Sequence, residues 1–203
     1  MNLATDIREN LGALPKSLHN TYDELFMRIK NQPQNERAAT LAGLKWAMCA
    51  PIKLKKEQWV QFTSRVKLVD TADRLLELCR NLIIWDRDWG FVGFAHLSVI
   101  EYLEKAQFSM EDAHLMAAEC CLSALNDCDG LISRADCDQN RFTFYSAIHW
   151  AYHTEQCAKA LEITASPERQ RLSRQLQQFL GTPGKPGSAY RNCDECLKVL
   201  HGQ

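Results

Sequence analysis

Apolar side chains recur at helical spacing along most of the chain. The first case is residues 20–30, where apolar positions at i, i+3, i+4 and i+7 define one face of a helix. A second helix is predicted over residues 36–50, because Pro51 cannot continue it. Further helices are predicted over residues 54–62, 71–80, 113–125, 142–163, 167–180 and 193–201, and another begins at Ser98.

The pattern changes once, between residues 82 and 94. Two runs rich in β-forming residues, 82–85 and 91–94, flank a turn-forming loop that ends in Gly90. This arrangement predicts a β-hairpin. Three helices followed by a hairpin is the element order of a winged helix-turn-helix.

Two helix starts carry a capping-box pattern, in which a serine side chain accepts a hydrogen bond from a backbone amide and an acidic side chain accepts one from the serine amide. Ser98 with Glu101 forms one pair, and Ser109 with Asp112 forms the other. The second pair precedes the nearly all-apolar residues 113–125, and such a helix must be buried on most sides.

The length of 203 residues accommodates two modules of about 100 residues each. We expect a mainly α protein with a winged-helix domain, including its N-terminal helix, in residues 1–105. A helical bundle is expected in residues 106–203. Within it, the polar residues 127–140 predict a loop, and the Gly- and Pro-rich residues 181–189 predict a linker or a mobile turn.

Composition narrows the class of protein. The 24 Lys and Arg residues nearly balance the 25 Asp and Glu residues, so no global positive field favours nucleic acid or anionic lipid. No apolar run approaches the roughly 20 residues that cross a bilayer, and charges interrupt the N-terminus where a signal peptide would be apolar. The nine cysteines, an odd number, are expected to be buried thiols in a reducing compartment. We therefore expect a cytoplasmic protein without a membrane partner.

Four sequence runs resemble one region of a known family. They are LPKSLHNTYDELFMRI (14–29), LLELCRNLIIW (75–85), FAHLSVIEYL (94–103) and FYSAIHWAYH (144–153). Their order and spacing are similar to the region that follows the NTPase core of NACHT-domain proteins, the winged helix of the GPI inositol-deacylase type. This region is abundant in fungal NOD-like receptors, where ankyrin or other repeats commonly follow. The resemblance covers roughly residues 12–155.

The resemblance implies a part in a STAND-type switch, in which ADP holds a closed state and exchange for ATP opens it. The implied partners are a NACHT NTPase domain and C-terminal repeats, in cis or in trans. ADP and ATP would bind the NTPase domain, because this chain has no P-loop: residues 181–185 have the wrong spacing and no preceding strand. A GxSxG nucleophile motif is also absent. We expect a fragment or a stand-alone relative that is not an enzyme and holds no cofactor itself.

His96 is the candidate nucleotide contact. The resemblance implies this role, because in NACHT proteins the histidine of an FxHxxxxE motif contacts the phosphate of bound ADP. Phe94, His96 and Glu101 match that motif. A helix N-terminus suits phosphate, since it presents unpaired amides and the positive end of the helix dipole. In the alternative interpretation, His96 continues the strand face of Val92 and Phe94 and is a hydrogen-bonded core histidine.

One helix carries an incomplete zinc pattern. His149, His153 and Cys157 fall at i, i+4 and i+8 on one face. A tetrahedral site needs a ligand from a second element, which the sequence does not identify. Trp150 and His153 also match positions that are packing residues in the family. We therefore expect no metal site here.

Two other patterns resemble metal or redox sites but lack residues that such sites require. The pair Cys193 and Cys196 lacks a second CxxC and a thioredoxin-like context. Residues 136–147 imitate a calcium loop, but Arg141 stands where glycine is required and Ala147 where the bidentate glutamate belongs.

DNA binding is the main alternative function, since it is the usual role of a winged helix. The candidate recognition helix, residues 71–81, has no net charge, because two arginines balance Asp73 and Glu77. The wing loop, residues 86–88, is acidic on balance and would be repelled by a duplex. We therefore expect no nucleic-acid partner and favour a non-catalytic regulatory or interaction module of a NACHT-type NTPase.

Overall fold

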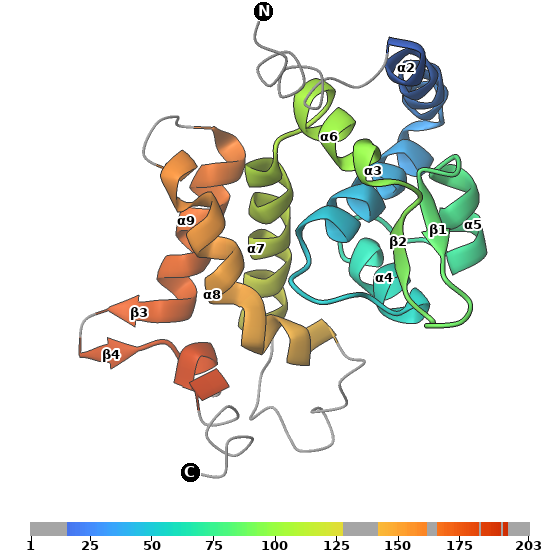
Figure 1. Ribbon diagram of the computed structural model, residues 1–203. Helices are drawn as coiled ribbons and strands as arrows, with labels where there is room; N and C mark the ends of the chain where they lie inside the picture. The colour runs from blue at the N-terminus through green and yellow to red at the C-terminus, as the bar shows by residue number, and fades with distance from the viewer. Residues whose placement is uncertain (1–15, 128–141, 162–165, 183, 192, 195–203) are drawn as a thin grey trace, which may run out of the picture.

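The computed structural model of the chain describes residues 16–127, 142–161, 166–182, 184–191, 193 and 194 (Figure 1). The helices are α2 (Lys16–Lys30), α3 (Gln34–Cys49), α4 (Lys56–Ser64), α5 (Ala72–Leu78), α6 (Leu97–Ala106), α7 (Met110–Asn126), α8 (Phe142–Leu161) and α9 (Pro167–Leu180). Strands β1 (Ile83–Trp85) and β2 (Val92–Phe94) pair antiparallel between α5 and α6. The predictions of a mainly α protein and of a small hairpin at 82–94 are confirmed.

The hairpin is attached to the helices by the segment between α3 and α4. Within the hairpin, Ile83 pairs with Phe94 and Trp85 with Val92. Lys55 then forms an antiparallel bridge with Phe91, and the Val92 amide donates to the Leu54 carbonyl at 2.9 Å. A single residue before α4 therefore extends the hairpin on its β2 side.

Helices α3, α4 and α5 pack closely at Gly43. The Trp59 indole nitrogen of α4 donates to the Gly43 carbonyl at 2.8 Å. A β-carbon at position 43 would stand 3.1 Å from the Trp59 ring and 3.3 Å from Leu75 of α5. The absence of a side chain at Gly43 therefore lets two neighbouring helices approach α3.

The connection from α5 to β1 has an uncommon backbone. Arg80 and Asn81 have φ angles of 53° and 62°, in the left-handed region. Asparagine tolerates this conformation, whereas for arginine it costs about 1–2 kcal/mol relative to a right-handed conformation. These two residues end the helix and turn the chain into the hairpin.

The predicted cap at Ser98 is wrong, and the cap at Ser109 is confirmed. Helix α6 begins at Leu97, and its N-cap is His96, so Ser98 lies inside the first turn. The Ser98 amide donates its hydrogen bond to the His96 imidazole, so it is not available to the Glu101 carboxylate that was expected to accept it. At α7, the Ser109 side chain accepts from the Asp112 amide and the Asp112 carboxylate accepts from the Ser109 amide, as predicted.

Helix α7 lies at the centre of the molecule, between the α3–α5 side and the α8–α9 side (Figure 1). Its Ala113, Ala117, Cys121 and Ala124 belong to the core that includes α2 to α6, and its Ala118, Leu122 and Leu125 belong to a second core with α8 and α9. This confirms that residues 113–125 are buried on most sides. The two regions predicted as separate modules thus share one helix.

The Gly- and Pro-rich segment forms a second small hairpin, β3 (Gly181–Thr182) with β4 (Lys185–Pro186). The Gly187 amide donates to the Leu180 carbonyl at 3.1 Å, which folds this turn back on α9. Most of the predicted 127–140 loop and of the predicted 193–201 helix lies outside the described residues. None of the described helices is long and apolar enough to cross a membrane.

Candidate functional site

His96 occupies the turn between β2 and α6 and is exposed to solvent. Its Nδ1 atom accepts a hydrogen bond from the Ser98 backbone amide at 3.1 Å, as an N-cap side chain does. The structure therefore does not place His96 in the core, which was the alternative interpretation of its strand-like spacing. Phe94 of the same motif is partly buried against the main core, and Glu101 is exposed on α6.

A short chain of hydroxyl groups fixes the ring of His96. Ser98 Oγ lies 2.6 Å from His96 Nδ1, and the buried Tyr22 hydroxyl of α2 lies 2.7 Å from Ser98 Oγ. Because Nδ1 acts as an acceptor, the neutral imidazole carries its proton on Nε2. The arrangement thus presents one N–H donor from an exposed side chain beside the positive end of α6.

The three residues of the predicted zinc pattern on α8 lie in different surroundings. His153 is fully buried, while Cys157 faces the second core and donates to the Thr154 carbonyl at 3.3 Å. His149 is partly buried, with its ring centroid 4.6 Å from that of Tyr145. Trp150 packs edge-on against Phe179 of α9, at 4.9 Å between centroids. The structure therefore does not assemble the three predicted ligands into one site.

Two residues that the sequence did not single out meet His153 instead. The Nδ1 atoms of His114, from α7, and His153 lie 2.9 Å apart, and Cys49 at the end of α3 completes the group. One ligand atom from each of the three side chains lies within 4.8 Å of the others, and all three residues are buried. Apart from His153, the sequence signal for this cluster was a histidine inside the nearly all-apolar α7.

The ionisation of this cluster follows from burial. Loss of solvent lowers the pKa of His114, and loss of solvent together with the nearby His114 and His149 lowers the pKa of His153 to about 3. Burial also raises the pKa of the Cys49 thiol far above its ordinary value. At neutral pH the cluster therefore consists of two neutral imidazoles and a protonated thiol.

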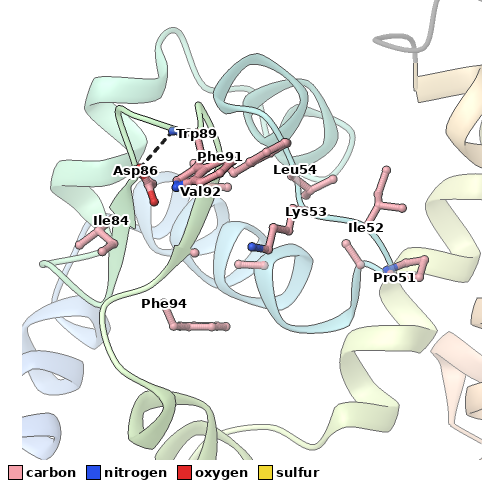
Figure 2. Close-up of a pocket in the computed structure, with 13 residues that line it drawn as sticks. Pro51, Ile52, Lys53, Leu54, Ile84, Asp86, Trp89, Phe91, Val92 and Phe94 are labelled. Carbon is pink, nitrogen blue, oxygen red and sulfur yellow. Dashed lines mark hydrogen bonds between the residues drawn. The ribbon is translucent and has the colours of Figure 1, made fainter.

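A groove of about 390 Å³ lies between residues 51–54 and the β1–β2 hairpin (Figure 2). Most of its lining residues are of apolar type, and Ile84 and Trp89 among them are exposed. Lys53 and Asp86 are its ionisable residues. The Asp86 carboxylate accepts a hydrogen bond from the Trp89 amide at 3.2 Å, which holds the loop between β1 and β2. The groove offers contact surface rather than a pair of groups for acid–base chemistry.

Two cationic side chains at the candidate recognition helix α5, Arg74 and Lys56, are paired with acids. Arg74 contacts Glu36 at 2.6 Å and Glu77 at 3.1 Å. Asp73 of the same helix binds Lys56, whose ammonium also lies 4.1 Å from the centre of the Trp85 ring. These contacts leave the surface of α5 without an excess of positive charge.

The pair of cysteines near the C-terminus is described only in part. Cys193 is buried and donates its thiol proton toward the Ala147 carbonyl at 3.5 Å, whereas Cys196 lies outside the described residues.

No family model, curated protein or solved structure matches this chain. The function is therefore argued from the residues and from their arrangement.

Proposed function

We propose that this protein is a non-catalytic regulatory module of a NACHT-type NTPase, built on a winged helix and a helical bundle. It would couple the nucleotide state of the NTPase domain to the arrangement of the parts that follow. The observation that carries the proposal is the position of His96, an exposed imidazole whose Nδ1 is fixed by the Ser98 amide at the start of α6.

The order of elements supports the winged-helix part of the proposal. A winged helix has three helices, a short strand after the first helix, and a two-stranded wing after the third. Here α3, the bridging residue Lys55, α4, α5 and the β1–β2 hairpin follow in that order. In this scheme α6 follows the wing directly, and His96 stands at their junction.

The geometry of His96 supports a phosphate contact. With Nδ1 occupied by the Ser98 amide, the Nε2–H group is the remaining donor of the neutral ring. The nearby start of α6 adds the positive end of the helix dipole, which favours an anion. If the ADP phosphate of a NACHT domain lay against His96 in the closed state, it would accept a hydrogen bond from the Nε2–H group. Opening would break that hydrogen bond.

DNA binding remains the second candidate, and the charges of the surface disfavour it. Acidic side chains pair with Arg74 on α5 and with Lys56 on the neighbouring α4, so these two positive charges are neutralised. The wing loop carries Asp86 and Asp88 next to Arg87, so its net charge is negative. A DNA backbone favours surfaces with unpaired cations, because affinity depends on the number of phosphates neutralised.

The test is ADP retention by a two-part protein. The chain would be joined to the NTPase core of a fungal NOD-like receptor in place of that receptor's own winged-helix region. His96→Asn keeps a good N-cap side chain but removes the imidazole donor. Loss of a hydrogen bond to phosphate costs about 1.5–3 kcal/mol, so ADP should dissociate roughly tenfold faster or more.

The control is His19→Asn, which alters an exposed histidine on α2 that is bonded to Asp23. It should leave ADP retention unchanged. If His96→Asn retained ADP as well as the control, the nucleotide role of His96 would be rejected. The chain alone is expected to show no ATP hydrolysis above a buffer blank.

A further inference from the structure

Cys49, His114 and His153 converge although they come from three helices. Cys49 ends α3, His114 lies in the first turns of α7, and His153 lies in the middle of α8. Their relative exposures are 3%, 4% and 0%, so the group is sealed from solvent. Sulfur and imidazole nitrogen are the ligand atoms that soft and borderline transition-metal ions prefer.

The two imidazoles direct ring nitrogens at one another and at a fixed hydroxyl group. Their Nδ1 atoms face one another at 2.9 Å, a hydrogen-bond distance, so in the metal-free protein one Nδ1 donates its proton and the other accepts. The other nitrogen of His153, Nε2, lies 2.7 Å from the buried Tyr145 hydroxyl on α8. A ligating histidine usually donates its second N–H to a fixed acceptor, which sets the orientation of the ring.

We propose that Cys49, His114 and His153 form a binding site for a soft monovalent transition-metal ion of the Cu⁺ class. Two neutral imidazoles and one thiolate carry a single negative charge, so a monovalent ion makes the buried site neutral. A divalent ion such as Zn²⁺ would leave an uncompensated positive charge in the core, which is costly in a low-dielectric interior. Within the described residues this His/Cys group offers three ligands, a number that suits a trigonal His₂Cys site.

Binding requires the buried group to open to solvent and its ligand atoms to rearrange. Metal–imidazole bonds are about 2.0–2.1 Å long, so two nitrogens on one trigonal ion lie about 3.5 Å apart. The pair at 2.9 Å must therefore separate slightly, and Cys49 must move toward it. The Nδ1 that donates in the metal-free pair must first pass its proton, through solvent, to Nε2 of the same ring, so that both Nδ1 atoms are free to bind the ion. The Cys49 thiol gives up its contact with the Ala113 carbonyl at 3.6 Å and loses its proton to solvent as the sulfur–metal bond forms. No electron is transferred, and the copper stays Cu⁺.

The ion would tie the two regions of the molecule together. Cys49 belongs to the α3–α5 side, while His114 and His153 belong to the α7–α8 pair. The site would fix the angle between these parts and make their relative motion dependent on metal. This inference does not rest on the relationship to NACHT proteins.

The experiment is an anaerobic titration of the full chain with Cu⁺ against the cuprous chelator bathocuproine disulfonate, followed by X-ray absorption at the copper edge. We expect one high-affinity equivalent with one sulfur and two nitrogen neighbours. A free-ion concentration about 100 times Kd should raise the melting temperature by roughly 5–10 °C. Cys49→Ala removes a ligand and should lower the affinity of that equivalent by at least the roughly 10–100-fold that loss of an outer-shell partner costs.

The matched control is Cys79→Ala, which removes an equally buried thiol of the same core that lies outside the cluster. It should leave the affinity and the coordination unchanged. Because His153→Gln could disturb folding, Cys49→Ala is the decisive variant. Copper surrounded by sulfur alone, unchanged affinity in Cys49→Ala, or tighter binding of Zn²⁺ than of Cu⁺ would each overturn the proposal.

Discussion

The hydroxyl groups of Tyr22 and Ser98 lie 2.7 Å apart, and Ser98 Oγ in turn lies 2.6 Å from Nδ1 of His96. This chain connects α2 to the start of α6. It holds the exposed His96 ring by contacts on its inner edge, and the outer edge carries the N–H group that we assign to phosphate. The contribution of these contacts to the free energy of unfolding can be measured without any binding partner.

Replacing His96 with alanine should destabilise the isolated protein by about 0.5–2 kcal/mol, because α6 loses its N-cap. His96→Asn should recover most of this loss, since asparagine is a favoured N-cap residue. Urea unfolding of the wild type and the two variants measures both effects. Equal stability of the alanine and asparagine variants would show that the bond to the Ser98 amide contributes little.

Arg80→Gly should stabilise the protein by roughly 0.5–1 kcal/mol. Glycine removes a left-handed cost of about 1–2 kcal/mol, partly offset by its greater entropy in the unfolded chain, about 0.5–1 kcal/mol. Arg80→Ala is the control, because it removes the charge but keeps the β-carbon and should not stabilise. Urea unfolding of the two variants measures the difference in their free energies of unfolding. If the glycine variant were no more stable than the alanine variant, backbone strain at Arg80 would be excluded.

Acid should destabilise the metal-free protein, beginning near pH 6.5. The pKa of His153 falls to about 3 in the folded state because the ring is buried among His114, His149, Tyr145 and Cys49. An unfolded histidine titrates near 6.5, so between these pH values the unfolded state binds the extra proton. Stability from this residue is present above pH 6.5 and is lost as the pH falls toward 3.

The slope of that loss can reach about 1.4 kcal/mol per pH unit for each histidine. Urea unfolding between pH 4 and pH 8 should show it, and His153→Gln should reduce the slope. His19→Gln is the control, because His19 is exposed and hydrogen-bonded to Asp23 on the surface of α2. An unchanged slope in His153→Gln would mean that His153 is not the residue responsible.

Duplex DNA should not bind above background. The ion pair between Arg74 and Glu36 at 2.6 Å and the acidic wing loop leave too few unpaired cations to neutralise phosphates. Fluorescence anisotropy with a random duplex at low and moderate salt provides the measurement. Submicromolar binding that weakens steeply with salt would favour the DNA-binding alternative.

Local patterns in the sequence predicted the helices and the β1–β2 hairpin, but not the β3–β4 hairpin, which was predicted as a linker or a mobile turn. The helical spacing located the helices, Pro51 stopped α3 as expected, and the β-rich runs around Gly90 located the hairpin. The start of α6 was misplaced because Ser98 carries a capping-box pattern, whereas the imidazole of His96 takes the same amide. An N-cap histidine has no sequence signature that separates it from a strand residue.

Contacts between distant segments could not be predicted in the same way. The bridge between Lys55 and Phe91 joins a single residue to the hairpin, and one residue leaves no periodic pattern. The meeting of Cys49, His114 and His153 depends on how α3, α7 and α8 cross, and spacing along one helix does not contain that angle. The sequence therefore identified His153 and assigned it the wrong neighbours.

The regulatory role is tested most directly by the affinity of the chain for a NACHT NTPase core in its two nucleotide states. A module that favours the closed state must bind the ADP-loaded core more tightly than the core loaded with a non-hydrolysable ATP analogue, because only a differential affinity shifts a population. Isothermal titration calorimetry with both forms of one core measures this. We expect a ratio of about tenfold or more in favour of ADP, reduced toward one by His96→Asn. Equal affinity for the two forms would contradict the account.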